Sequence, residues 1–287
     1  MDSLTKNKTL RIAIQGGYGA FHDIAARLYF ENQPIEIIPN DTFKDLFASL
    51  KSREADVGIM AIENSLAGSI LPNYTILKES GMKIIGEIYL QITLNLVALS
   101  GQTIGDLREV YSHPMAILQS QQFFGNYPNI RLVDSIDTAI SAKEIAEKQL
   151  RGVGAIASRY AAEKYNLEIL AEGIESNKMN YTRFLIVKDT NGNIKGNGRI
   201  NKSSVSFSLA HEIGGLSKIL SILSYYNMNL TKIQSMPIPG KDWEYHFYVD
   251  MMFTDYRLYL QSLEAIRPFT SDLTILGEYE KGKSVTG

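Results

Sequence analysis

Residues 57–62 read Val-Gly-Ile-Met-Ala-Ile, a nearly continuous apolar run between Asp56 and Glu63. Short runs of this kind are typical of strands that are covered on both faces, as in parallel sheets flanked by helices. The preceding segment has an apolar stripe of helical spacing, formed by Phe43, Leu46, Phe47 and Leu50. Thr42 and Asp45 have capping-box spacing, so we expect this helix to begin at Thr42.

The same alternation of strands and helices continues in both directions along the chain. Residues 10–14 form an apolar run that enters a glycine turn and then a helix with Phe21, Ile24, Ala25 and Leu28 on one face. One long strand is predicted from the alternating residues Ile88, Leu90, Ile92, Leu94 and Leu96. Further buried strands are expected at residues 153–157 and 184–187. Strands that alternate with helices predict a mainly parallel sheet.

Residues 189–202 break this pattern, because three glycines and four asparagines replace all periodicity. A segment of this composition is expected to be a linker. Beyond it, the apolar patterns change from strand to helix in the order strand, helix, strand, strand, helix, strand, at residues 205–209, 213–226, 230–236, 245–251, 258–266 and 273–279. This is the βαββαβ order of a ferredoxin-like module.

The composition excludes several classes of function. The chain has 287 residues, a net charge of −2 and no cysteine. The balanced charge gives no bulk electrostatic reason for a nucleic acid or an anionic membrane as partner. The lack of cysteine excludes disulfides and thiolate chemistry, and the four histidines lie too far apart for a metal site. We expect a cytoplasmic protein, since neither a signal-peptide pattern nor an apolar run of roughly 18 residues is present.

Polar residues follow several predicted strands at the carboxyl ends, where open parallel sheets bind ligands, and three more lead into the strand predicted at residues 184–187. They are the hydroxyl, amide and guanidinium groups of Asn64, Ser65, Ser112, Gln119, Ser158, Asn180, Thr182 and Arg183. This set suits a small, polar, anionic ligand, because an Arg fork and helix N-termini both bind carboxylates.

Each of these features also has a purely structural interpretation. Residues 63–65 are equally suited to cap the next helix. Gly17-x-Gly19 lacks the further glycine and the downstream acid of a dinucleotide-binding motif, so a plain turn is expected. His113 before a proline is more often a capping residue than a base, and Thr182 with Arg183 resembles an ordinary strand entry. Periodicity alone therefore stops at an α/β domain that binds a small anion, followed by a ferredoxin-like module.

Five motifs make the chain resemble the prephenate dehydratases. Asn180-Tyr181-Thr182-Arg183-Phe184 is similar to the family's Asn-x-Thr-Arg-Phe motif, and four more stretches match in the same order, at residues 16–26, 62–68, 112–119 and 157–162. The chain departs from the motifs at Gly17, Ala20, His22, Met115 and Ser120, and none of these changes touches the Thr-Arg-Phe core.

The C-terminal module resembles the regulatory ACT domain. Gly214-Gly215-Leu216 stands at its Gly-Ala-Leu motif, and Asn229 and Leu230 lead to Gln234-Ser235-Met236-Pro237 at its Glu-Ser-Arg-Pro motif. Gln234 and Met236 replace a Glu and an Arg, so a charge pair of the family motif is lost.

The resemblance implies an architecture and an activity. It implies a two-lobed catalytic domain of the periplasmic-binding-protein type 2 class at residues 9–188, a linker at 189–202 and an ACT domain at 203–282. It also implies a lyase that converts prephenate to phenylpyruvate in L-phenylalanine biosynthesis. No cofactor is implied, because aromatisation drives the reaction. An arogenate dehydratase, or a non-catalytic amino-acid sensor, is the alternative.

The resemblance also assigns roles to residues. Thr182 is the expected catalytic residue, as a hydrogen-bond donor to the departing hydroxyl. The implied substrate-binding residues are Asn64, Ser65, Ser112, Gln119, Ser158, Arg183 and Phe184. L-Phenylalanine is the implied effector of a homodimer or homotetramer, and it is expected to bind near Gly214, Gly215, Leu216, Asn229, Leu230, Gln234, Ser235, Met236 and Pro237.

Overall fold

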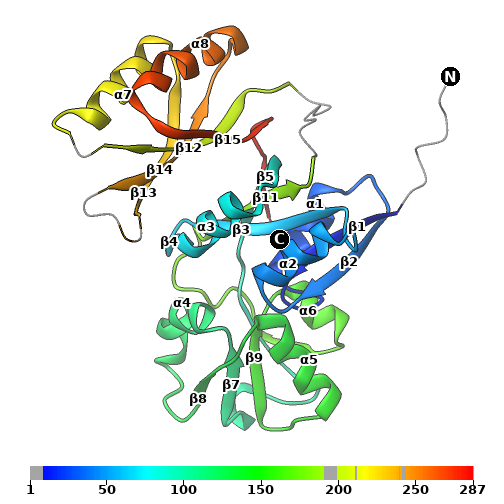
Figure 1. The fold of residues 1–287 in the computed structure, drawn as a ribbon. Coiled ribbons are helices and arrows are strands. Elements are labelled where there is room, and N and C mark those ends of the chain that lie inside the picture. Colours follow the sequence, from blue (N-terminus) through cyan, green and yellow to red (C-terminus); the bar gives the residue numbers. More distant parts are fainter. Residues whose placement is uncertain (1–8, 191–198, 211, 239, 241–243, 287) are drawn as a thin grey trace. The chain divides into compact units, whose positions relative to one another are not determined.

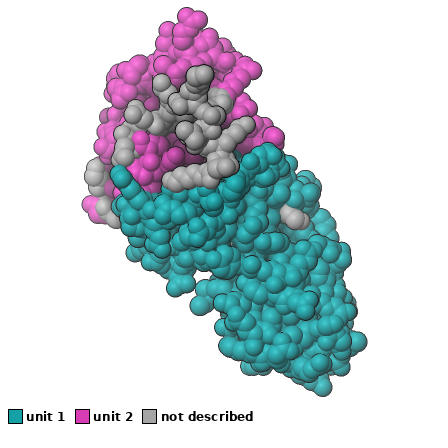
Figure 2. Space-filling view, turned by 90° about the vertical axis from the view of Figure 1, so that its right-hand side faces the viewer, with its two compact units in different colours: residues 1–68, 88–184, 284–287 teal, residues 69–87, 185–283 magenta. Residues whose placement is uncertain are grey.

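The computed structural model describes residues 9–190, 199–210, 212–238, 240 and 244–286. The chain has a mixed α/β fold (Figure 1) and divides into two compact units, coloured separately in Figure 2. Unit 1 comprises Met1–Gly68, Ile88–Phe184 and Ser284–Gly287, and unit 2 comprises Ser69–Glu87 and Leu185–Lys283. In the described ranges, no helix combines the length and apolar character needed to cross a bilayer. Most of the predicted linker, residues 191–198, lies outside the described residues.

The first lobe of unit 1 contains a sheet in the order β5-β11-β3-β1-β2. Its strands are β1 (Leu10–Gln15), β2 (Ile35–Asn40), β3 (Val57–Asn64), β5 (Lys83–Gln91) and β11 (Tyr181–Lys188), with β16 (Ser284–Thr286) beside β5. β1 pairs with β2 and β3 in parallel, as the buried run at residues 57–62 predicts. Helices α1 (Phe21–Tyr29) and α2 (Phe43–Lys51) connect these strands, and the capping box of Thr42 and Asp45 is present.

The second lobe contains a five-stranded sheet in the order β10-β6-β9-β7-β8. The strands are β6 (Asn95–Ala98), β7 (Glu109–Ser112), β8 (Arg131–Asp134), β9 (Val153–Ala157) and β10 (Glu168–Ala171), and a short 3-10 helix covers Ile104–Asp106. The helices are α4 (Pro114–Phe124), α5 (Thr138–Lys148) and α6 (Arg159–Lys164). Small buried residues such as Ala139, Ala142 and Ala161 let α5 and α6 pack closely on this sheet.

The long strand predicted over residues 88–96 is wrong, because the chain crosses from one lobe to the other in the middle of it. β5 ends at Gln91 and β6 begins at Asn95, in a different sheet. At the crossing, the Ile92 N–H donates to the Asn180 carbonyl oxygen (2.7 Å), and the Leu94 N–H donates to the Glu175 carboxylate (2.8 Å). The alternation continues through the break because both strands are buried, so the pattern carried no sign of it.

The glycine turn of the first lobe contacts α6 of the second lobe directly. The Ser158 hydroxyl donates to the Gly19 carbonyl oxygen at 2.8 Å, and the Tyr165 hydroxyl donates to the Tyr18 carbonyl oxygen at 2.8 Å. Gly19 has a φ of +89°, and a Cβ there would lie 3.0 Å from Ala161. Both the backbone conformation and the close approach therefore require glycine at this position.

Unit 2 contains the predicted βαββαβ module. Its elements are β12 (Lys202–Leu209), α7 (Gly215–Tyr225), β13 (Asn229–Pro237), β14 (Tyr245–Met252), α8 (Tyr256–Ile266) and β15 (Ser271–Tyr279), with a 3-10 turn at Arg267–Phe269. These strands form an antiparallel sheet in the order β13-β14-β12-β15, so the predicted element order is confirmed. Phe207, Val249 and Tyr259 are among the fully buried residues of its core.

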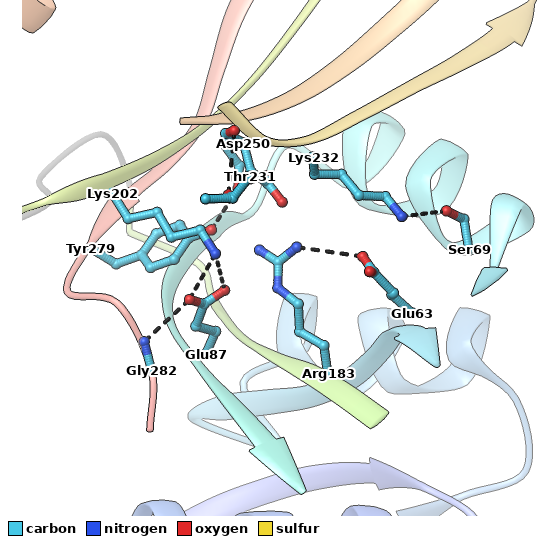
Figure 3. A network of polar contacts seen from close by, with 11 residues as sticks. Glu63, Ser69, Glu87, Arg183, Lys202, Thr231, Lys232, Asp250, Tyr279 and Gly282 are labelled. Atoms are coloured by element: carbon cyan, nitrogen blue, oxygen red, sulfur yellow. Dashed lines mark hydrogen bonds and ion pairs between the residues drawn. The ribbon is translucent and has the colours of Figure 1, made fainter. Parts of the chain in front are cut away.

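Unit 2 also includes a stretch from the middle of the chain, residues 69–87, with α3 (Leu71–Ser80) and the beginning of β5. The two-residue strand β4 (Gly68–Ser69) precedes it. The Lys202 ammonium group bonds both Glu87 carboxylate oxygens, at 2.8 and 2.9 Å, in a pair that is buried on both sides (Figure 3). Residues 69–87 therefore pack with the C-terminal module, although they lie inside the range 9–188 predicted for the catalytic domain.

Candidate active site

Four side chains from both lobes of unit 1 form one hydrogen-bonded chain. Asn64 lies at the end of β3, Asn180 and Thr182 lie at the start of β11, and Gln119 lies on α4. The Asn64 amide nitrogen donates to Asn180 Oδ1 (2.7 Å) and to Thr182 Oγ1 (3.0 Å). Asn180 in turn donates to Gln119 Oε1 at 2.9 Å. The predicted residues Asn64, Gln119 and Thr182 are thus brought together, and we call these four residues the amide chain.

The loop after β3 holds Asn64 in place. Its side-chain oxygen accepts the backbone N–H groups of Leu66 and Ala67, at 3.0 and 2.9 Å. Asn64 therefore caps this turn, while α3 begins after Ile70 without any side-chain cap. The helix-cap interpretation of residues 63–65 is accordingly wrong, because a turn and the short strand β4 precede the helix.

Ser65 connects the loop after β3 to residues 179–181, which return from the second lobe, through hydrogen bonds. Its hydroxyl donates to the Met179 carbonyl oxygen and accepts the Tyr181 N–H, both at 2.9 Å. Its own N–H donates to the Tyr181 carbonyl oxygen at 2.8 Å. Because these bonds occupy the Ser65 hydroxyl, we assign it to positioning the start of β11 rather than to contact with a ligand.

Three further residues expected to bind substrate are buried away from the amide chain. The Ser112 hydroxyl donates to the Ile156 carbonyl oxygen at 2.8 Å and is fully buried. Ser158 caps α6 through the Ala161 N–H while bonding Gly19, so both functions of its hydroxyl are used. Phe184 is only 1% exposed and belongs to the core. These side chains support the lobes, and the structure does not place their polar or aromatic groups in the cluster.

Arg183 does not join Thr182, although the two residues are neighbours. Successive side chains of a strand point to opposite faces of the sheet. The Arg183 guanidinium lies 3.9 Å from the Glu63 carboxylate and is 4% exposed (Figure 3). The two-residue repeat of the strand places it on the other face of β11 from Thr182, so the hydrogen bonds of the amide chain do not include the predicted binding residue Arg183.

His22 supports the same region from the start of α1. Its Nε2 accepts the Ala61 N–H at 3.3 Å, and its ring meets the edge of Phe184 with centroids 4.9 Å apart. Burial lowers the pKa of His22 to about 3, so the ring is neutral at physiological pH. His113, by contrast, caps α4 by accepting the Met115 N–H, which confirms the capping interpretation of that residue.

Two residues of this region were given no role by the family resemblance, although Asn180 belongs to the polar set at the predicted strand ends. Asn180 is fully buried and central to the amide chain, and its place in the Asn-x-Thr-Arg-Phe motif was the available signal. Asp137 caps α5 by accepting the Ala139 and Ile140 N–H groups, and burial raises its pKa. A Cβ on Gly16 would lie 2.8 Å from the Asp137 carboxylate, so the first glycine of the turn is needed for close approach.

The predicted effector residues lie in unit 2, at the start of α7 and at the two ends of β13. Gly214 is the N-cap of α7 with a φ of 76°, and Gly215 and Leu216 open the helix. Gln234, Ser235, Met236 and Pro237 end β13, at the same end of the sheet, because Ser208 and Met236 both pair with His246. Asn229 and Leu230 begin β13 and lie at the opposite end.

The chemistry available in the amide chain is that of neutral hydrogen bonding. Thr182, Asn64 and Gln119 are partly exposed, whereas Asn180 is 0% exposed beneath them. Within the described residues, no group of three or more His, Asp or Glu side chains is placed to hold a metal ion. The arrangement is suited to binding and polarising oxygen atoms of a small ligand.

The comparisons with known proteins agree on one family. The family model described as prephenate dehydratase matches residues 12–192. The bifunctional chorismate mutase/prephenate dehydratase of Aquifex aeolicus is 34% identical over 97% of this chain and 75% of its own length. Arogenate dehydratase 2 of Petunia hybrida is 36% identical over 98% of this chain and 74% of its own length.

Two solved structures share the fold over 94% of this chain. The prephenate dehydratase of Arthrobacter aurescens in complex with L-Phe has a TM-score of 0.83 at 25% identity, over 89% of that chain. GqqA, described as a novel type of quorum quenching acylase, has a TM-score of 0.84 at 28% identity, over 98% of that chain. The matched family model and the relatives above 30% identity place this chain in the prephenate dehydratase family.

Proposed function

We propose that this protein is a prephenate dehydratase, a carbon–oxygen lyase that converts prephenate to phenylpyruvate with loss of carbon dioxide and water. The observation that carries the proposal is the amide chain, in which the Thr182 hydroxyl oxygen lies 3.0 Å from the Asn64 amide nitrogen. The protein that contains it matches the prephenate dehydratase family model. In the reaction, the carbon–carboxylate bond breaks and its electron pair enters the ring, while the ring carbon–oxygen bond breaks and hydroxide leaves as water.

Thr182 is the catalytic residue of this proposal. Its oxygen accepts a hydrogen bond from Asn64, so its own proton is available to the oxygen that departs from the ring. A Thr hydroxyl is too weak an acid to transfer the proton by itself, and it instead stabilises the negative charge that develops on that oxygen. Donors of this type typically contribute about 10²–10³-fold to the rate.

Substrate binding falls to Asn64 and Gln119 in this arrangement. The two hydrogens of the Gln119 side-chain NH₂ group donate to the carboxylate or keto oxygens of the substrate. The carboxylate that leaves as carbon dioxide is better held by neutral donors than by a close cation, because its charge moves into the ring as the bond breaks. The position of Arg183 on the other face of β11 agrees with this requirement.

The substrate distinguishes the two activities found among the relatives. Arogenate differs from prephenate by an amino group in place of the keto oxygen, and its dehydration yields L-phenylalanine directly. The purified chain is incubated with each substrate, and phenylpyruvate is measured by its absorbance in alkali and L-phenylalanine by chromatography. Phenylpyruvate from prephenate supports the proposal. Turnover of arogenate alone supports the alternative enzyme, and the absence of both products supports a sensor without catalytic activity.

Unit 2 is proposed to be an ACT regulatory domain that responds to L-phenylalanine, and the two lobes of unit 1 a catalytic domain of the periplasmic-binding-protein type 2 class. The antiparallel order β13-β14-β12-β15 supports the first assignment. The two sheets joined by the crossing at residues 92–94 support the second. The Arthrobacter relative crystallised with L-Phe, which supports the choice of effector.

The assembly is proposed to be a homodimer, or a homotetramer built from it, with two copies of β13 side by side. β13 is a nine-residue edge strand whose side chains remain exposed at every second position. Antiparallel pairing centred on Ile233 would bring Asn229 of one copy beside Pro237 of the other. This arrangement would unite the two separated groups of effector residues.

The regulatory proposal is tested with L-Phe, and D-Phe serves as control. L-Phe is expected to inhibit turnover and to raise the melting temperature, since a ligand at 100 times its Kd stabilises a protein by about 2.7 kcal/mol. Sedimentation velocity measures the oligomer. If millimolar L-Phe changes neither the turnover nor the melting temperature, the Gln234 and Met236 replacements have removed the effector site and the regulatory proposal fails.

A further inference from the structure

We propose that Asn180 is a positioning residue that passes the hydrogen-bond direction fixed at Asn64 on to Gln119, so that Gln119 presents its NH₂ donors to the substrate beside the Thr182 hydroxyl. The inference rests on the proposed function and adds a residue to it. Asn180 is fully buried and acts through Asn64 and Gln119 rather than by contact with the ligand.

The direction begins at the loop after β3. The Asn64 side-chain oxygen accepts two backbone N–H groups, those of Leu66 and Ala67, at 3.0 and 2.9 Å. A backbone N–H only donates, so the opposite end of the Asn64 amide must be its NH₂ group. Its two hydrogens are used by Asn180 Oδ1 at 2.7 Å and by Thr182 Oγ1 at 3.0 Å.

Asn180 passes this direction to the other lobe. Because its oxygen accepts from Asn64, its nitrogen must face Gln119, where the contact to Oε1 is 2.9 Å. The Gln119 side-chain oxygen therefore accepts the hydrogen bond from Asn180, and the Gln119 NH₂ group remains available to donate to a ligand. Among the described residues, neither the Gln119 NH₂ group nor the Thr182 hydroxyl proton has a protein acceptor in the hydrogen bonds formed. Both ends of the amide chain therefore point donors outward.

The backbone keeps Asn180 in this role. Its carbonyl oxygen accepts the Ile92 N–H at 2.7 Å, which ties it to the crossing between the lobes. The Gln119 carbonyl oxygen accepts the Ser176 N–H at 2.8 Å, so the partner on α4 is anchored to the same returning segment. Asn180 is thereby fixed between the strand that carries Thr182 and the helix that carries Gln119.

The direction matters because prephenate offers acceptors. It carries two carboxylates, a keto oxygen and a hydroxyl oxygen, and these need donors from the protein. If Asn180 could not donate, Gln119 would rotate its NH₂ group towards Asn180 and present its carbonyl oxygen to the ligand. An oxygen facing a carboxylate removes a hydrogen bond and adds repulsion.

Asn180→Asp tests the direction, because an ionised carboxylate accepts but cannot donate, whereas a protonated one can do both. At neutral pH the variant is expected to lose kcat/KM by about 10- to 10²-fold, the usual cost of losing one hydrogen bond to a charged group. As the pH is lowered from 8 to 5.5, the ratio of wild-type to variant kcat/KM is expected to shrink, since protonation of the buried Asp restores the donor to Gln119. Each rate is corrected for conversion without enzyme.

Asn180→Ala is the matched control, because it removes the side chain and has nothing to titrate. It is expected to lose activity without recovery at low pH. An Asn180→Asp profile parallel to that of the wild type would overturn the inference while the proposed function stands. A wild type that converts neither prephenate nor arogenate would overturn the proposed function, and the inference with it. Thermal unfolding of each variant at each pH identifies any loss of fold.

Discussion

The Asn64 amide nitrogen donates to the Thr182 hydroxyl oxygen across 3.0 Å, joining the last residue of β3 to the second residue of β11. Because the hydroxyl oxygen accepts this bond, its own proton is directed away from Asn64. A side chain that sequence reasoning selected by motif alone thus acquires a defined chemical orientation, and the orientation leads to direct tests.

Thr182→Ala is expected to lower kcat by about 10²–10³-fold, because the developing charge on the departing oxygen loses its donor. Thr182→Ser keeps the hydroxyl and is expected to retain most of the activity. Phenylpyruvate formation from prephenate measures both, and circular dichroism verifies that each variant is folded. Comparable turnover by the Ala variant and the wild type would remove Thr182 from the mechanism.

Ser158→Ala is expected to destabilise the protein by about 1–2 kcal/mol, because it removes a helix cap as well as a bond between the lobes. Thr42→Ala is the matched control, since Thr42 caps α2 without contacting the other lobe. Urea unfolding measures both variants. The difference between them reports the bond to Gly19, and equal losses would mean that this bond contributes nothing.

Acid is expected to weaken the fold through His22, whose pKa burial lowers to about 3. The unfolded chain binds a proton at this residue below about pH 6.5, whereas the folded chain does not do so until about pH 3. The free energy of unfolding should therefore fall as the pH drops between these values, by at most about 1.4 kcal/mol per pH unit. His22→Gln should flatten this slope, and an unchanged slope would assign the acid sensitivity to other groups.

Lys202→Met is expected to destabilise unit 2 by about 3–5 kcal/mol, because it removes the buried ammonium group that bonds both Glu87 carboxylate oxygens. Adding Glu87→Leu to this variant should recover most of the loss, since a well-packed apolar pair often replaces a buried ion pair at little cost. A double-mutant cycle of thermal unfolding measures the coupling. Additive losses would show that the two side chains do not depend on each other.

Deletion of residues 200–287 is expected to lower the stability of the remaining chain. The deletion removes the sheet against which residues 69–87 pack, including the ring of Tyr248, whose centroid lies 4.9 Å from that of Tyr74. The melting temperature of the shortened chain measures the effect. A melting temperature equal to that of the full chain would mean that residues 69–87 fold without the C-terminal module.

Local patterns predicted the elements well where burial and capping act over a few residues. The capping box at Thr42 and the six elements from residue 202 onward follow from spacing and alternation, and the structure has them. The break between β5 and β6 escaped prediction because Ile92 and Leu94 continue the alternation while their N–H groups bond distant residues. Periodicity reports burial, and Ile92 and Leu94 are buried although they lie in neither strand.

The site was predicted by motif and corrected by geometry. Asn64, Gln119 and Thr182 are brought together by the fold, although any two of them are at least 55 residues apart in the sequence. The separation of Arg183 from the amide chain could have been predicted from the sequence, because a strand places neighbouring side chains on opposite faces. The separation of the Ser112 and Ser158 hydroxyls from it could not, since their acceptors are backbone carbonyl oxygens that only the fold brings near.

The buried pair of Lys202 and Glu87 bears on how such a protein can change during evolution. Lys202 belongs to the C-terminal module, and Glu87 lies in a strand encoded more than 100 residues earlier, with the two side chains 115 positions apart. A gene fusion that carried only residues 199–283 to another enzyme would transfer the ammonium group without its carboxylate. We therefore expect residues 69–87 and the C-terminal module to be retained together during evolution.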